Sequence, residues 1–74
     1  GVEVDVTRRL LAGEPGAQDE FVKVFGRKVF QYSYLTCGRR EDAEEVAQET
    51  LLKMLQNLGS LRDPTAVKTW AFQI

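Results

Sequence analysis

Carboxylates are densest between residues 41 and 49, where no basic residue interrupts them. In this run Glu45 and Glu49 stand four residues apart, which places both side chains on one face of a helix. Paired carboxylates can hold a metal ion, but such sites normally recruit His or further carboxylates from other helices. The chain has no His and one Cys, so we expect no metal site, no cofactor and no Cys–His or Ser–His catalytic couple. These residues do not indicate an enzyme.

The same acidic segment suits protein binding better than catalysis. Leu52 falls in the middle of the polar side of the helix predicted here. An apolar anchor among amides and carboxylates is typical of a face that docks a partner helix, and that partner would be basic. A plain solvated face explains the pattern as well, since acidic residues near a helix N-terminus stabilise its dipole. The face consists of Glu41, Glu45, Gln48, Glu49, Leu52 and Gln56.

Near the end of the chain, cations and aromatic rings are interleaved: Arg62, Lys68, Trp70 and Phe72. Such a pattern can bind single-stranded nucleic acid, because cations meet phosphates and rings stack on unpaired bases. Trp70 also lies on the apolar stripe of its predicted helix, which favours a core position, so Phe72 is the better candidate for stacking. With two cations, the segment alone is expected to bind DNA weakly and with strong salt dependence.

Composition places the chain among soluble globular domains. Its 74 residues allow one domain, and 43% hydrophobic with 28% charged residues is ordinary for that class. No apolar run is long enough to span a membrane, and the start shows no signal peptide. The single cysteine, Cys37, cannot form an internal disulfide, which fits a reducing cytoplasm. Ile74 carries no helix stop signal, so we expect the natural chain to continue beyond it.

Gly13, Gly38 and Gly59 each follow an apolar-periodic segment, where a left-handed cap residue is expected. They predict an all-α, compact bundle of about four helices, with Asp5 and Asp63 as candidate N-caps. The alternating valines at the start would also suit a strand, but no partner strand is apparent. The expected helices cover about residues 5–12, 15–36 and 41–58, with a fourth opening at 63–64.

Each of the three longer helices has an apolar stripe that we expect to face the core. The stripes are Phe21, Val24, Phe25, Val29, Tyr32 and Leu35 in the second helix, Ala43, Ala47, Thr50, Leu51, Met54 and Leu58 in the third, and Val67, Trp70, Ala71 and Ile74 in the fourth.

Three segments resemble a known family. Residues 41–53, EDAEEVAQETLLK, resemble the D-A-E-D-L-V-Q-E-T-F-L-K segment of sigma-70-type sigma factors and are closest to the extracytoplasmic-function (ECF) group. Residues 68–74, KTWAFQI, are similar to that group's R-T-W-L-Y-R-I. Residues 11–14, followed by residues 21–25, resemble its opening A-G-D…F…L-Y. Three motifs in the family's order and near its spacing are fairly specific.

The resemblance implies a single helical sigma region 2 domain over residues 1–74, with the −35-binding domain outside it. In the family the acidic helix docks on the clamp helices of the RNA polymerase β′ subunit. The last helix and the loop before it capture the non-template strand of the promoter −10 element as it melts. The implied polymerase-binding residues are Asp42, Glu45, Gln48, Glu49 and Leu52. The implied DNA-binding residues are Arg62, Lys68, Thr69, Trp70 and Phe72, with Ser60 and Asp63 as further loop contacts.

Some residues depart from the family's pattern, mostly in the DNA-binding half. Gln73 stands where a basic residue is usual, and Asp63-Pro64 replaces small polar loop residues. Glu45 replaces the usual Asp, which keeps the charge, and Ala47 replaces a larger apolar residue. An alternative is therefore a sigma-like module that binds polymerase or an anti-sigma factor without melting promoters. A stand-alone duplex-binding bundle would need a basic recognition helix, whereas the most regular exposed helix here is acidic.

Overall fold

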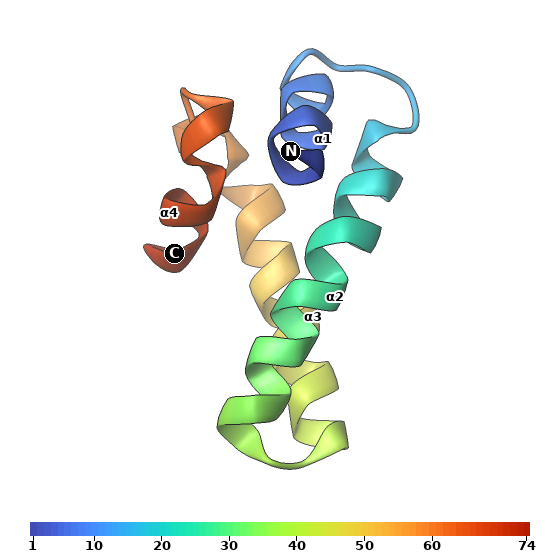
Figure 1. Ribbon diagram of the computed structural model, residues 1–74, viewed down its shortest axis with the longest axis vertical. Coiled ribbons are helices and arrows are strands. Elements are labelled where there is room, and N and C mark those ends of the chain that lie inside the picture. The colour runs from blue at the N-terminus through green and yellow to red at the C-terminus, as the bar shows by residue number, and fades with distance from the viewer.

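The computed structural model describes all residues from 1 to 74 and contains helices but no strand (Figure 1). The all-α prediction is confirmed. The elements are α1 (Val2–Leu11), α2 (Ala17–Cys37), α3 (Arg40–Gln56), two 3-10 turns (Leu58–Ser60 and Pro64–Ala66) and α4 (Val67–Phe72).

The long helices α2 and α3 form an antiparallel hairpin that runs the length of the molecule (Figure 1). Gly38 closes α2 with φ of 75° and its amide donates to the carbonyl of Tyr34, so the predicted left-handed cap is confirmed. Arg39 is extended and precedes α3 directly, which makes the connection between the helices very short.

The core lies at one end of this hairpin, where α1 and α4 pack beside it (Figure 1). Side chains from every helix meet there, and Phe21 and Phe25 of α2 stack with their ring centroids 4.6 Å apart. The buried cluster consists of Val6, Phe21, Phe25, Met54, Leu61, Val67 and Trp70. The stripe predicted for α3 reaches this cluster through Met54, and its Ala43 and Ala47 are buried farther along the hairpin, whereas the stripe of α2 is buried only near this end.

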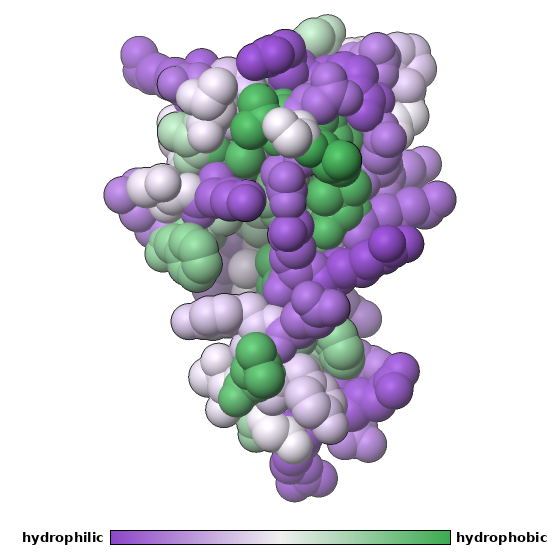
Figure 2. Space-filling model, viewed as in Figure 1, coloured by the Kyte–Doolittle hydropathy of each residue, from purple (hydrophilic) through white to green (hydrophobic).

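The far half of the hairpin has no such cover. Tyr32 and Leu35, which were expected on the buried stripe of α2, are 62% and 84% exposed. The reason is that α1 and most of α4 pack near the other end, so this part of α2 is bordered by α3 and, at Tyr32, by the Phe72 ring at the end of α4 (Figure 1). In Figure 2, hydrophobic atoms gather in the upper half of the visible face, while a smaller hydrophobic patch marks the lower half.

Several predicted helix ends are wrong. Helix α1 begins at Val2 with Gly1 as its N-cap. Asp5, which was predicted to be the N-cap, lies inside the helix, and its backbone amide donates a hydrogen bond to the Gly1 carbonyl. Gly59 has no positive φ, because it lies inside a 3-10 turn. Helix α4 ends at Phe72, so Ile74, which was predicted on the buried stripe of this helix, lies outside it and is 41% exposed. None of the helices combines the length and the apolar character needed to cross a bilayer.

Candidate functional site

One face of α3 presents the predicted protein-binding side chains to solvent. Leu52 is 56% exposed, whereas Ala43 and Met54 on the opposite side of the helix are fully buried. Helical periodicity puts the set in a continuous row, because its members are three or four residues apart. All of its members are exposed on α3: Asp42, Glu45, Gln48, Glu49 and Leu52.

The carboxylates of this face are mostly free. Asp42 lies 3.9 Å from the guanidinium of Arg39, and Arg40 pairs with Glu44 at 3.2 Å, both near the start of α3. No ion pair engages Glu45 or Glu49. Glu45 and Glu49 therefore carry negative charge that no ion pair neutralises on the face of Leu52, although Lys53 stands next to Leu52 in the sequence.

The predicted DNA-binding residues lie in α4 and the segment before it. Arg62, Lys68, Thr69 and Phe72 are exposed, and the Phe72 side chain is 76% accessible. Trp70 differs, because it is 9% exposed and belongs to the core cluster. The structure brings the four exposed residues to the surface and supports the core position that the apolar stripe indicated for Trp70.

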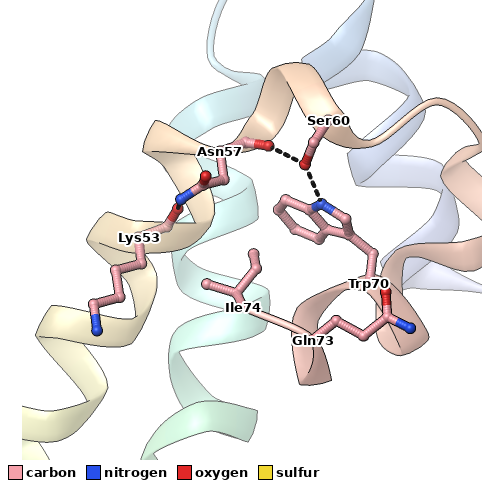
Figure 3. Close-up of a pocket in the computed structure, with 6 residues that line it drawn as sticks. All are labelled: Lys53, Asn57, Ser60, Trp70, Gln73 and Ile74. Carbon is pink, nitrogen blue, oxygen red and sulfur yellow. Dashed lines mark hydrogen bonds between the residues drawn. The ribbon is translucent and has the colours of Figure 1, made fainter.

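A chain of hydrogen bonds fixes the Trp70 indole (Figure 3). Its Nε1–H donates to the Ser60 hydroxyl at 2.8 Å, and that hydroxyl donates to the Asn57 carbonyl at 2.7 Å. The bonds join α4 to the turn after α3. Because its hydroxyl serves both bonds, Ser60 acts here as a structural link between the two segments.

Beside this indole lies an open pocket of about 460 Å³ (Figure 3). Its walls come from the end of α3, the following turn and the end of α4, and they mix amide, hydroxyl, ammonium and apolar groups. Such a mixture suits a planar polar group with one apolar face. The lining residues are Lys53, Asn57, Ser60, Trp70, Gln73 and Ile74.

Asp63 caps the turn that precedes α4, as predicted. Its Oδ1 accepts from the backbone amide of Thr65 at 3.0 Å and from the Thr65 hydroxyl at 2.7 Å. These bonds stabilise the charged carboxylate and lower the pKa of Asp63 below its ordinary value. Its side chain, like that of Ser60, is therefore already engaged within the protein.

Two features near α4 have no counterpart in the predicted site. The Lys28 ammonium lies 2.8 Å and the Lys68 ammonium 4.0 Å from the same oxygen of Glu3. The hydrogen bond from Lys28, with help from the backbone and from Lys68, lowers the pKa of Glu3 to about 2.

The second feature is an aromatic contact, in which the Tyr32 ring meets the Phe72 ring edge to face with ring centroids 5.9 Å apart. One pattern in the sequence could have indicated these residues: a lysine stands four residues before an aromatic residue twice, as Lys28 before Tyr32 and as Lys68 before Phe72.

Comparison with known proteins supports the family resemblance. The family model for sigma-70 region 2 matches residues 21–74, which leaves α1 outside the match. The ECF RNA polymerase sigma factor SigW of Bacillus subtilis (strain 168) is 28% identical over 76 residues, covering 99% of this chain. The chain spans 41% of that relative's length. No solved structure gives a significant match. The chain thus belongs to the sigma-70 family, carries its region 2, and resembles the ECF group.

Proposed function

We propose that this chain acts in transcription initiation by docking the exposed face of α3 on the clamp helices of the RNA polymerase β′ subunit. The observation that carries the proposal is the row of free carboxylates and amides around the exposed Leu52. A partner helix can bury Leu52 while its basic residues meet Glu45 and Glu49. The domain would then contribute binding and positioning, with no bond made or broken.

Replacing Leu52 with Asp tests the docking face. We expect Leu52→Asp to weaken binding to core RNA polymerase by about 30-fold, as for a central interface residue. Helicity should stay unchanged, because the side chain is 56% exposed. Binding is measured by fluorescence anisotropy of labelled protein titrated with core polymerase, and helicity by circular dichroism.

Leu35→Asp is the matched control, because Leu35 is 84% exposed on α2, away from the α3 face. It should bind polymerase like the wild type. Equal losses in both variants, or unfolding of Leu52→Asp, would contradict the docking face.

We further propose that α4 and the preceding loop hold the melted non-template strand of the −10 element. Arg62 and Lys68 would contact phosphates, Phe72 would stack on an unpaired base, and Thr69 would hydrogen-bond to the strand. Trp70 would support this surface from below and border the pocket beside it, which has the size and polarity to accept a base. Stacking and the pocket would together offset the lost base pairing.

Phe72→Ala tests this second role. We expect it to lower affinity for a fluorescein-labelled oligothymidylate by about five-fold or more, because one base–ring stack is lost. Tyr34→Ala is the control, since that ring is 45% exposed and contacts Phe30 within α2. Weak DNA binding by the wild type together with intact polymerase binding would favour the alternative, a sigma-like module that does not melt promoters, and unchanged DNA affinity in Phe72→Ala would contradict the stacking role of Phe72.

A further inference from the structure

Two cation–aromatic pairs face each other across the gap between α2 and α4. Lys28 and Tyr32 are one turn apart on α2, and Lys68 and Phe72 are one turn apart on α4. The two rings touch, and the two ammonium groups approach one oxygen of Glu3. Corresponding members of the two pairs therefore meet in space, cation near cation and ring against ring.

We propose that the single-stranded DNA surface is shared between these helices, with Lys28 and Tyr32 of α2 contacting the strand beside Lys68 and Phe72 of α4. The inference rests on the proposed DNA-binding role of α4 and adds residues from a separate element. Neither Lys28 nor Tyr32 lies in a segment to which that role was assigned.

The aromatic pair has the exposure of a binding surface. Tyr32 is 62% and Phe72 76% exposed, and neither ring packs against the apolar core. An aromatic contact that only stabilises a fold is normally buried, because most of its free energy comes from removing ring area from water. The rings meet at 76°, so they form an angled notch in which a base can stack on one ring and lie against the other.

The two lysines give this notch the charge that a phosphate requires. Their side chains are 50% and 66% exposed, and one carboxylate oxygen holds both ammonium groups nearby. A phosphate oxygen can take the place of that carboxylate, because it offers the same negative charge to the same donors. Cations and rings then alternate over the surface as phosphates and bases alternate along a strand. A basic protein segment would meet repulsion from the same lysines.

The direct test compares Tyr32→Ala with Tyr34→Ala in the oligothymidylate assay. We expect Tyr32→Ala to lower affinity by about five-fold or more and Tyr34→Ala to leave it unchanged. Both tyrosines are exposed on α2, but only Tyr32 touches α4. Circular dichroism checks that both variants keep the helicity of the wild type, and Tyr32→Phe, which keeps a ring, should bind nearly as well as the wild type.

The charged half is tested by Glu3→Gln and Lys28→Met. Removing the carboxylate frees both ammonium groups for phosphate, so Glu3→Gln should raise DNA affinity by about three-fold, an effect of the size of one surface ion pair. Lys28→Met is made in the Glu3→Gln background, so that no carboxylate loses its partner. Compared with Glu3→Gln alone, the double variant should show a plot of log binding constant against log salt concentration whose slope is smaller in magnitude by about 0.7. Lys23→Met is the control, since Lys23 is exposed on α2 and has no ion-pair partner.

The outcomes separate this inference from the function on which it rests. If Phe72→Ala weakens DNA binding while Tyr32→Ala behaves like Tyr34→Ala, the shared surface is wrong and the DNA-binding role of α4 stands. If neither variant changes DNA binding, both proposals fail. If Tyr32→Ala weakens binding to core polymerase and not to oligothymidylate, the surface binds protein and the inference is overturned.

Discussion

The Trp70 indole shows how one side chain can connect separate segments of a small domain. Its ring fills the core, and its N–H reaches the Ser60 hydroxyl, which in turn bonds the Asn57 carbonyl. A buried donor without a partner costs more than the bond itself contributes, so this acceptor matters for the position of α4.

Trp70→Phe should therefore destabilise the fold and, because the ring only borders the proposed base pocket, lower oligothymidylate affinity less than Phe72→Ala does. We expect a loss of about 1–2 kcal/mol, from the hydrogen bond and the smaller ring. Ser60→Ala removes the acceptor from the same bond, so a double-mutant cycle should give a coupling of about 1 kcal/mol. Urea unfolding provides these values. Additive losses would show that the bond contributes nothing, and a loss of oligothymidylate affinity as large as that of Phe72→Ala would mean that Trp70 itself stacks on DNA.

At this scale the sequence predicts the direction of side chains better than their partners. Leu52 and Phe72 point outward as the helical period predicts, because the period alone fixes which side of a helix a residue occupies. The contacts of Tyr32 with Phe72 and of Lys28 with Glu3 join different helices. They depend on how those helices pack, which no local pattern contains.

Gly38 governs the most demanding turn, since α3 follows α2 almost directly. Its φ of 75° lies in the left-handed region, where a side chain is disfavoured. An added methyl group would meet no atom within 4 Å there, so its effect would come from the backbone alone.

Gly38→Ala should lower the stability of the domain by about 1 kcal/mol. Gly59→Ala is the matched control, because Gly59 also has open space around it but no positive φ. It should be neutral or slightly stabilising, since alanine restricts the unfolded chain. Thermal unfolding followed by circular dichroism compares the two variants. Equal stabilities would show that the turn tolerates a side chain at residue 38.

Element types could be predicted from the sequence, and element ends often could not. Apolar periodicity identified the helices, and Asp63 and Gly38 marked real caps. Asp5 failed as a cap because the helix gains a further turn from Gly1, whose carbonyl accepts the Asp5 amide. The third helix stops at Gln56, where the Asn57 side chain bonds the carbonyl of Lys53 and a 3-10 turn follows.

Across the whole molecule, Glu3 joins three helices by ionic contacts. It lies on α1, and its partners Lys28 and Lys68 lie on α2 and α4. Arg9 makes a similar contact between α1 and the start of α2, because its guanidinium pairs with Asp5, Glu14 and Glu20. These carboxylates raise the pKa of Arg9 above its ordinary value, so it stays charged. The short helix α1 is thus held by charge as well as by Val6.

The folded-state pKa of Glu3, about 2, predicts a pH dependence of stability. A carboxyl whose pKa is lowered by folding stabilises the protein above its unfolded value of 4.5, and that contribution is lost as pH falls towards 2. We expect the melting temperature to drop over this range, and Glu3→Gln to show a smaller drop. Glu41→Gln is the control, because Glu41 is exposed and unpaired. Identical acid profiles for wild type and Glu3→Gln would rule out this role.

The position of the indole also gives the molecule a built-in optical reporter. Trp70 is the only tryptophan in the chain, so its emission is free of overlap from other indoles. It stands where α4 meets the turn after α3, one wall of the open pocket (Figure 3). Undocking of α4 would expose the ring to water and shift its emission to longer wavelength. A base that enters the pocket would quench it, so unlabelled protein can report both its folding and the occupancy of its proposed site.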